Sequence, residues 1–335
     1  MKIAFFELFS QEQEAFKKLL QDDELYFFEE KLNEKNVQKV EEVEIISIFI
    51  NSVISKSVVD SLPNLKFITT RSTGFEHIDL KYCSDKGIKV SNVPFYGSHT
   101  VAEFTFALIL NLSRNIISAN NHLRDSMDFN FYSSLKGFDL HGKTLGVIGT
   151  GRIGKNVIKI AQGFEMNVLA YDIFPDAKFA EENNFAYKSL LEVLAESDII
   201  TVHTPYTKEN HHLINKENIS NMKKGIFVVN TARGALIDTE ALIWGINKGI
   251  IAGVGLDVLE GERDMKIESE IIGSYGSEQI DYKMIVENQI LIDMPQVVIT
   301  PHIAFYSKEA EDRIVKTTAD NIRMFIGNEP QNLIK

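Results

Sequence analysis

The sequence predicts an α/β fold made of two Rossmann-like domains, each with a doubly wound parallel sheet. Strand-like apolar runs alternate with helical stretches along the chain, which is the rhythm of βαβ units. The length of 335 residues, at about 150 residues per domain, suggests two domains. A glycine-rich strand-to-helix turn at residues 149–154 opens a second series. We therefore expect a smaller, flavodoxin-like first domain and a larger second domain.

Four strands are expected in the first hundred residues, at 2–8, 44–50, 67–71 and 89–90. Residues 11–20 have the apolar spacing of a helix. Residues 100–123 contain neither Pro nor Gly and are strongly apolar, which predicts one long helix.

The second series has six expected strands, at 144–149, 167–171, 199–202, 226–230, 251–256 and 297–300. Six strands with intervening helices match one doubly wound dinucleotide-binding unit. Residues 263–294 are polar without clear periodicity, so we expect a long loop with short helices there. Residues 307–326 are predicted to form an amphipathic helix.

Composition excludes several classes of protein. Lys and Arg number 35 against 47 Asp and Glu, and a net charge of −12 disfavours nucleic-acid and anionic-membrane partners. The single cysteine, Cys83, cannot form an internal disulfide or a thiolate metal cluster. The apolar start is interrupted by Glu7, and no run approaches the roughly 18 apolar residues of a membrane span. We expect a soluble, cytoplasmic protein.

The glycine-rich turn predicts a dinucleotide site formed by six residues: Gly149, Thr150, Gly151, Arg152, Ile153 and Gly154. Gly149 permits the tight turn, Gly151 lets the backbone approach a pyrophosphate, and Gly154 allows close helix–sheet packing. The helix N-terminus would favour the negative charge, and Arg152 would add a positive one. A plain turn is the alternative interpretation.

Asp172 predicts which dinucleotide is bound. It ends the strand that follows the turn, near the spacing at which a carboxylate accepts hydrogen bonds from a ribose diol. A carboxylate there would repel a 2′-phosphate, and the next three residues, 173–175, include no Arg to receive one. The expected cofactor is therefore NAD rather than NADP.

Further motifs carry a resemblance to a known family. They are Arg71-Ser72-Thr73-Gly74, Asn92-Val93-Pro94-Phe95-Tyr96, Val229-Asn230-Thr231-Ala232-Arg233-Gly234, Gly255-Leu256-Asp257-Val258-Leu259-Glu260-Gly261-Glu262 and Thr300-Pro301-His302-Ile303-Ala304. With the glycine turn, they make the chain resemble the D-2-hydroxyacid dehydrogenase family, most like its D-lactate dehydrogenase branch. The resemblance implies that the chain returns to its first domain, giving a substrate domain of residues 1–98 and 300–335 and an NAD-binding domain of residues 99–299.

Three residues are the expected catalytic set. Arg233 can hold the oxygens of a 2-oxo acid bidentately. Imidazole as a side-chain type titrates near neutral pH, so His302 suits a group that donates and accepts a proton; by resemblance, Glu262 would pair with it and favour the imidazolium. The alternatives are a surface ion pair for Arg233 and a strand cap for His302.

The resemblance implies further contacts. The substrate carboxylate would meet the backbone N–H groups of Thr73 and Gly74 and the hydroxyl of Tyr96. Further cofactor contacts would be His203, Thr204, Pro205, Thr231, Ala232, Asp257 and His302. A packing role is the alternative for Tyr96 and His203. The adjacent His211 and His212 are interpreted as surface or structural residues, and no metal site is expected.

The implied activity is interconversion of pyruvate and D-lactate with NAD. The alternatives are another 2-oxo acid, such as glyoxylate, hydroxypyruvate or a bulkier one, and an NADH-sensing protein without catalysis. Lactate enzymes often carry Trp near residues 130–136, where this chain offers Phe131 or Tyr132. The family is commonly dimeric, so we expect a homodimer, with residues 102–112 as the candidate face or, alternatively, as internal core.

Overall fold

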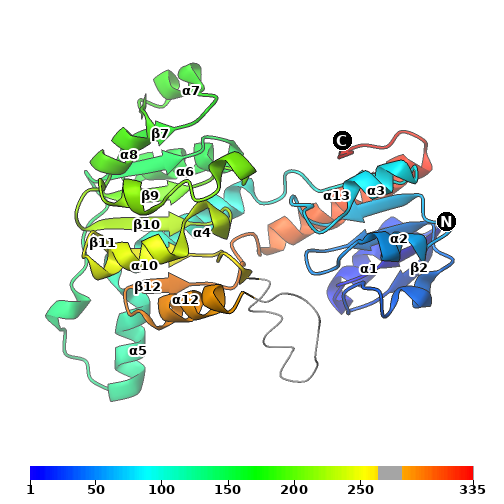
Figure 1. Cartoon of the computed structure of the whole chain (residues 1–335), viewed down its shortest axis with the longest axis horizontal. Helices are drawn as coiled ribbons and strands as arrows, with labels where there is room; N and C mark the ends of the chain where they lie inside the picture. The colour runs from blue at the N-terminus through cyan, green and yellow to red at the C-terminus, as the bar shows by residue number, and fades with distance from the viewer. Residues whose placement is uncertain (263–280, 335) are drawn as a thin grey trace. The chain divides into compact units, whose positions relative to one another are not determined.

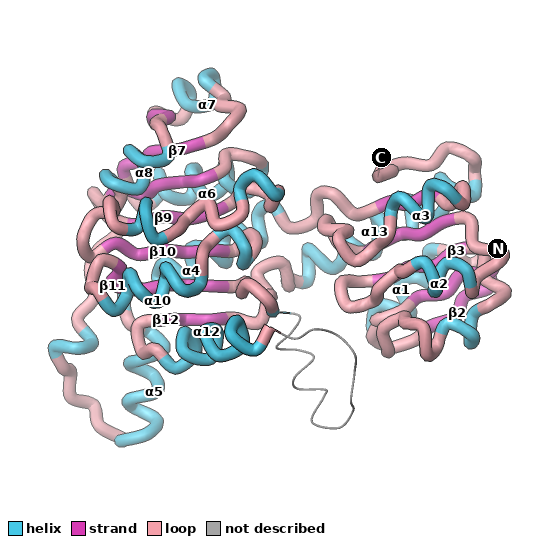
Figure 2. Tube along the Cα trace, in the orientation of Figure 1, coloured by secondary structure: helices cyan, strands magenta, loops and turns pink. Residues whose placement is uncertain are grey.

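The structure is a computed structural model that describes residues 1–262 and 281–334. The chain divides into two compact units, Met1–Tyr96 with Tyr306–Lys335, and Gly97–Phe305. Figures 1 and 2 show helices and a parallel sheet in each unit. The predicted boundaries at 98 and 300 move to 96 and 306. Residues 300–305 belong to the second unit, because the side chain of Asp257 binds that segment.

Unit 1 contains a parallel sheet of five strands in the order β2-β1-β3-β4-β5, which is the flavodoxin-like order. The strands are β1 (Lys2–Phe5), β2 (Glu24–Phe27), β3 (Ile45–Ile48), β4 (Phe67–Thr70) and β5 (Lys89–Ser91). The helices are α1 (Ser10–Leu19), α2 (Lys56–Asp60), α3 (Leu80–Asp85), α13 (Lys308–Ile326) and the 3₁₀ turn η1 (Val37–Val40). The predicted fold class is confirmed, and β2 is an edge strand that the sequence analysis missed.

The C-terminal helix α13 belongs to unit 1, as predicted. Its N-cap Ser307 accepts a hydrogen bond from the backbone N–H of Ala310. Its apolar face is buried, and the ring of Phe325 stacks on that of Phe67 in β4 at a centroid distance of 4.4 Å. Burial of this face is what returns the end of the chain to the first sheet.

The described residues of unit 2 form a parallel sheet of seven strands in the order β12-β11-β10-β9-β6-β7-β8. The strands are β6 (Thr144–Ile148), β7 (Asn167–Tyr171), β8 (Ala186–Tyr187), β9 (Ile199–Val202), β10 (Ile226–Asn230), β11 (Ile251–Leu256) and β12 (Val297–Ile299). The strand order reverses at β6, which makes the end of β6 the switch point where such sheets bind ligands. The two-residue edge strand β8 was not predicted.

The helices of unit 2 cover both faces of this sheet, as Figure 1 shows. They are α4 (Ser98–Arg114), α5 (Ile116–Ser126), α6 (Arg152–Gly163), α7 (Ala177–Glu182), α8 (Leu190–Glu196), α9 (Lys216–Ile219), α10 (Thr239–Asn247) and α12 (Tyr282–Asp293). The 3₁₀ turns are η2 (Ser133–Leu135), η3 (Lys208–Asn210) and η4 (Gly234–Leu236). A long loop with short helices was predicted for residues 263–294, and its first part, 263–280, lies outside the described residues. The remainder, 281–294, is mostly the regular helix α12.

The single helix predicted over residues 100–123 is instead two helices. Asn115 separates them in a left-handed conformation with φ of 51°, which Asn adopts more readily than most residues. The side chain of Asn111 accepts a hydrogen bond from the N–H of Ile117 and supports the break. The absence of Pro and Gly therefore did not guarantee a continuous helix.

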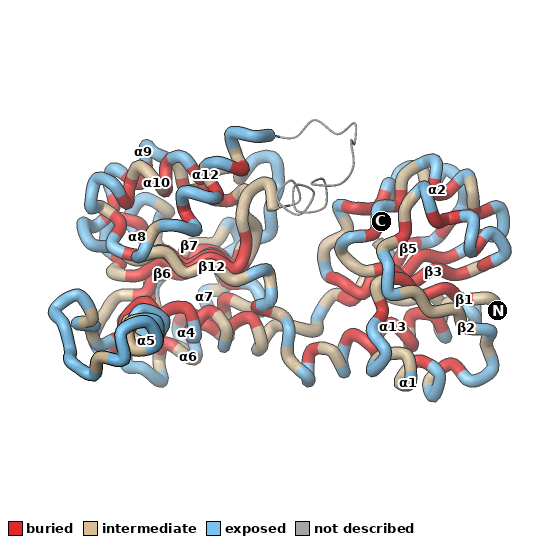
Figure 3. The backbone as a smooth tube through the Cα atoms, turned by 90° about the horizontal axis from the view of Figure 1, so that it is seen from below, coloured by how far each residue is buried: buried red, intermediate tan, exposed pale blue. Residues whose placement is uncertain are grey.

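Most residues of the candidate dimer face at 102–112 pack inside the second unit, whereas Glu103 and Ala107 are exposed. Ala102, Phe106, Leu108, Ile109 and Leu112 are all buried within the second unit. In contrast, none of the residues of α5 is buried, as Figure 3 shows. In the described part of the chain, no helix is both long and apolar enough to cross a membrane.

Candidate active site

The predicted site residues of unit 2 follow neighbouring strands of one parallel sheet. Gly149 comes directly after β6, Asp172 after β7 and His203 after β9. Arg233 follows β10, Asp257 and Glu262 follow β11, and His302 follows β12. Because all seven strands are parallel, these residues lie at the same edge of the sheet, the carboxyl edge where doubly wound folds bind ligands.

The glycine turn has room for a phosphate at one position only. Gly149 has φ of +93°, and a Cβ there would lie 2.7 Å from the backbone nitrogen of Thr204. A Cβ on Gly154 would lie 2.0 Å from the carbonyl oxygen of Gly149, so the helix and turn pack without any side chain. A Cβ on Gly151 would meet no atom of the described residues within 4 Å. This space at the start of α6 fits a pyrophosphate.

Asp172 is held against this turn. Its Oδ2 accepts hydrogen bonds from the backbone N–H of Thr150 at 2.6 Å and from the Thr150 hydroxyl at 2.9 Å. Its Oδ1 accepts from the N–H of Phe174 at 2.8 Å. A carboxylate has about four acceptor positions, so three bonds orient this one and leave acceptor capacity for a ribose hydroxyl.

His302 and Glu262 form a direct pair. Nδ1 of His302 lies 2.8 Å from Oε1 of Glu262, and the two side chains are 26% and 31% exposed. A carboxylate on Nδ1 favours the tautomer with a proton there and stabilises the imidazolium when the ring is charged. The other ring nitrogen, Nε2, is then the atom that can exchange a proton with a substrate.

Asp257 positions the segment that carries His302. Its Oδ1 accepts from the hydroxyl of Thr300 at 2.6 Å and the N–H of Ile303 at 2.9 Å, and its Oδ2 accepts from the N–H of Ala304 at 2.8 Å. Burial raises the pKa of Asp257, although these hydrogen bonds oppose the shift. His302 sits within this clamp with φ of +56°. Asp257 therefore holds the backbone segment that carries the imidazole.

Arg233 lies in a turn that the side-chain amide of Asn230 holds with two hydrogen bonds. The side chain of Asn230 donates to the carbonyl of Arg233 and accepts from the N–H of Ala232. The buried hydroxyl of Thr231 lies 3.1 Å from that of Thr105 in α4. The guanidinium of Arg233 donates to the carbonyl of Ala232 through Nη1 at 2.8 Å. Thr231 and Ala232 thus shape the turn that presents Arg233.

The next residue, Gly234, is packed against the loop after β11. A Cβ there would lie 2.0 Å from the carbonyl carbon of Leu259 and 2.2 Å from the nitrogen of Glu260. The backbone that follows Arg233 thus touches the backbone two residues before Glu262. This contact brings the loops of β10 and β11 together, and the sequence analysis did not identify it.

His203 is buried at the end of β9, beside the glycine turn. Its Nε2 lies 2.8 Å from the hydroxyl of Thr201, whereas its buried Nδ1 has no hydrogen-bond partner among the described residues. Burial lowers the pKa of His203 to about 3, so the ring is neutral at physiological pH. The adjacent carbonyl of Pro205 accepts from Asn210, while the Thr204 backbone packs on Gly149.

The neutral His203 predicts an acid-sensitive fold. The imidazole of His203 has a pKa of 6.5 in the unfolded chain and of about 3 in the folded chain. As the pH falls below 6.5, the unfolded chain therefore binds a proton that the folded chain does not, and the free energy of unfolding decreases. Between pH 7 and pH 5, this group alone should lower the free energy of unfolding by about 2 kcal/mol. Urea unfolding at both pH values should show a smaller loss for His203→Gln than for the natural protein. Equal losses would contradict the assignment.

The predicted substrate residues Thr73, Gly74 and Tyr96 lie in unit 1, in the loops after β4 and β5. The hydroxyl of Thr73 donates to the carbonyl of Val93, and Ser72 donates to the carbonyl of Gly74. The carbonyl of Tyr96 accepts from Nε of Arg313 at 2.6 Å. Because β4 and β5 are paired in parallel and Thr73 binds Val93, the two loops lie at the same edge of the sheet of unit 1.

Arg71 supports this loop and was overlooked as a site residue. It is fully buried, and its Nη2 donates to the carbonyls of Phe6 and Glu7, each at 2.7 Å. Its Nη1 donates to the hydroxyl of Ser47. Arg71 therefore joins the ends of β1, β3 and β4. The signal available in the sequence was its position directly before Ser72-Thr73-Gly74.

Comparisons with known proteins identify the family. Residues 106–304 match the NAD-binding domain of the D-isomer specific 2-hydroxyacid dehydrogenases. The chain is 37% identical to the D-lactate dehydrogenase of Escherichia coli, over 89% of this chain and 88% of the relative. It is 41% identical to an aromatic 2-oxoacid reductase of Clostridium sporogenes, over 84% of this chain and 82% of the relative.

A comparison with solved structures also finds a member of this family with a similar fold. The D-lactate dehydrogenase of Aquifex aeolicus, complexed with NAD and lactic acid, matches with a TM-score of 0.84 and 36% identity. The match covers 98% of this chain and 96% of that one. The glycine turn and Asp172 lie within the matched NAD-binding region. The protein belongs to the D-isomer specific 2-hydroxyacid dehydrogenase family, an NAD-dependent family of oxidoreductases.

Proposed function

We propose that the protein is an NAD-dependent D-lactate dehydrogenase that reduces pyruvate to D-lactate and catalyses the reverse reaction. The observation that carries the proposal is the 2.8 Å pair between His302 and Glu262. This pair lies at the same sheet edge as the glycine turn and Arg233. An acid–base group and a cation beside a dinucleotide site are what reduction of a 2-oxo acid requires.

In this proposal His302 is the proton donor. NADH, when bound, supplies the hydride that adds to the carbonyl carbon of the 2-oxo acid. The electron pair of the C=O bond moves to oxygen, which takes a proton from Nε2 of His302. Glu262 stabilises the charged ring before transfer through its bond to Nδ1. In the reverse direction, the neutral imidazole takes the proton from the hydroxyl group.

The substrate carboxylate is assigned to Arg233. A guanidinium presents paired N–H donors that match a carboxylate and orient the carbonyl for attack. The backbone N–H groups of Thr73 and Gly74 and the hydroxyl of Tyr96 are proposed as further carboxylate contacts. Asp257 is proposed to act as a positioning residue, because its carboxylate binds the segment around His302.

The preference for NAD is assigned to Asp172. We expect Asp172→Ala to weaken NADH binding, because the ribose loses its acceptor, and to relax discrimination against NADPH, because the repelling charge is gone. Fluorescence titration with both cofactors measures the ratio of dissociation constants. Asp176→Ala is a control, since Asp176 lies four residues further along the same loop, where it caps α7 and pairs with Lys155 of α6 at 2.5 Å. An unchanged ratio in Asp172→Ala would refute the assignment.

A panel of 2-oxo acids tests the substrate. We expect kcat/KM with NADH to be highest for pyruvate, compared with glyoxylate, hydroxypyruvate and phenylpyruvate. The second candidate is an aromatic 2-oxo acid, favoured by the 41% identity to an aromatic 2-oxoacid reductase. Preference for phenylpyruvate would support that candidate. NADH binding without turnover of any acid would instead indicate a cofactor-sensing protein.

We also propose a homodimer formed through α5 and the segment after it. Five large apolar side chains there are exposed by 46% or more: Ile116, Ile117, Met127, Phe129 and Phe131. So many exposed apolar side chains in one short segment are unusual on a monomer's surface and fit a second copy of the chain. One cysteine in the whole chain supports a reducing, cytoplasmic location.

The exposed apolar segment gives a direct test of the dimer. The double variant Phe129→Glu and Phe131→Glu should shift the protein toward monomer in light-scattering chromatography, because two charges would be buried unpaired in the interface. The two side chains are 87% and 96% exposed in the single chain, so the fold itself should be unaffected. A natural protein that is already monomeric, or a variant that stays dimeric, would contradict the proposed interface.

A further inference from the structure

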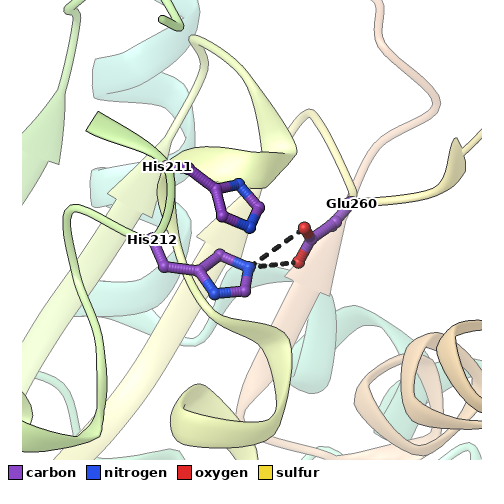
Figure 4. Close-up of side chains that lie close together, drawn as sticks. All are labelled: His211, His212 and Glu260. Atoms are coloured by element: carbon purple, nitrogen blue, oxygen red, sulfur yellow. Dashed lines mark hydrogen bonds and ion pairs between the residues drawn. The ribbon is translucent and has the colours of Figure 1, made fainter. Parts of the chain in front are cut away.

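Outside the catalytic set, three potential metal ligands converge in unit 2. Among the described residues, His211, His212 and Glu260 form a group whose candidate ligand atoms all lie within 4.8 Å of one another. The two histidines lie between η3 and α9, in the loop that follows β9, and Glu260 lies in the loop after β11. Figure 4 shows the two imidazoles side by side, with the carboxylate facing them.

The backbone holds the two imidazoles together. His212 has φ of +52°, a left-handed conformation that costs an ordinary residue about 1–2 kcal/mol. Consecutive side chains consequently point the same way, and the rings stack at a centroid distance of 3.8 Å. The N–H of His212 donates to the carbonyl of Ala235, and Ile214 donates to Leu236, so the loop is tied down on both sides of the turn.

Glu260 is equally well fixed. Its carbonyl accepts from the side chain of Asn288 in α12 at 2.8 Å, and its backbone nitrogen lies beneath Gly234. Its carboxylate is only 14% exposed, and both oxygens lie 3.0 Å from Nε2 of His212. Ligands of one zinc ion, at about 2.0–2.2 Å each, stand roughly 3 Å apart. The spacing of this pair therefore suits a shared cation as well as a hydrogen bond.

The donor set indicates the class of ion. Two imidazoles and one carboxylate suit zinc and its first-row neighbours, whereas magnesium and calcium prefer oxygen ligands alone. His211 is exposed and His212 is 31% exposed, which leaves an entry path and room for water in the remaining coordination positions. Open zinc sites with three protein ligands have this composition.

We propose that His211, His212 and Glu260 bind one divalent first-row transition-metal ion, with Zn²⁺ as the best-suited ion. The ion would join the loop after β9 to the loop after β11. The latter carries Glu262 two residues further on and touches the backbone of Gly234. The site is thus placed to stiffen the loops that present the proposed catalytic residues. Metal binding itself does not depend on the proposed substrate or on turnover.

Calorimetric titration of the untagged, chelator-treated full chain with ZnCl₂ tests the proposal. We expect one Zn²⁺ per chain, a higher Tm with Zn²⁺ than without it, and no comparable binding of Mg²⁺. Replacing His211 with alanine should weaken Zn²⁺ binding by more than about tenfold, given that even supporting residues of metal sites are worth 10–100-fold. This change should leave the fold intact, since the side chain is exposed and the His212–Glu260 contact remains.

A matched control separates the site from adventitious binding by surface histidines. His141 is 74% exposed and pairs with Glu165 at 3.1 Å, away from the group of three. His141→Ala should bind Zn²⁺ as the natural protein does. The proposal is overturned if the natural protein shows no saturable Zn²⁺ binding, or if His211→Ala and His141→Ala bind equally. Equal affinity for Mg²⁺ would also overturn the assigned donor chemistry.

Discussion

Replacing His302 with alanine is expected to lower kcat for pyruvate reduction by about a hundredfold or more, the usual contribution of a positioned acid–base group. The dissociation constant of NADH should change little, because the proposed proton donor acts on the substrate oxygen. The hydrogen bond to Glu262 is lost together with the ring. Steady-state kinetics and a fluorescence titration of NADH measure the two quantities separately.

Two further variants separate chemistry from structure. His302 has φ of +56°, and asparagine adopts this conformation more readily than alanine, so His302→Asn keeps the backbone while removing the acid. It should lose as much kcat as His302→Ala. Glu262→Gln keeps a side-chain oxygen that can accept from Nδ1 but removes the charge, so its loss should be smaller. If His302→Asn retains activity, or if NADH binding falls in parallel with kcat, His302 is a structural residue.

Local sequence patterns predicted most of the fold because most of its elements are locally determined. Buried parallel strands give continuous apolar runs, and glycines mark the turn after β6. The two missed strands are short edge strands: β2 is only partly buried and β8 has two residues. Both depend on pairing with a neighbour rather than on their own apolar content. The break at Asn115 likewise depends on a side chain four residues earlier, Asn111.

In the candidate site, too, local motifs predicted the candidate catalytic residues but not the contacts that support them. Sequence motifs indicated Arg233, Glu262 and His302, because each lies in a short motif that resembles one of the family's motifs. The supporting contacts join residues far apart in the chain: Asp257 reaches Ala304, and His212 reaches Glu260 over 48 positions. A buried arginine such as Arg71 carries no local signal of its burial. The order of the strands in the sheet determines which distant residues meet, and a local sequence pattern does not contain that information.

Adding one methyl group at Gly234 is expected to disturb the site strongly without touching any catalytic side chain. The Cβ of an alanine would lie 2.0 Å from the carbonyl carbon of Leu259, a backbone atom that cannot rotate away. The loops after β10 and β11 must therefore separate, which moves Arg233 relative to Glu262. A displacement of about 1 Å can cost roughly a hundredfold in rate, and overpacking should lower the free energy of unfolding by about 1–3 kcal/mol.

Gly163→Ala is the matched control for this prediction. Gly163 ends α6, and a Cβ there meets no atom within 4 Å in the part of the chain that the structure describes. Alanine should therefore leave kcat/KM unchanged and should stabilise the helix by up to about 1 kcal/mol. Kinetics with pyruvate and urea unfolding of both variants make the comparison. Because Gly234 has no unusual φ, only the close contact distinguishes it from Gly163. If Gly234→Ala retains full kcat/KM, the packing of the two loops does not position Arg233, and the arrangement proposed for the site is wrong.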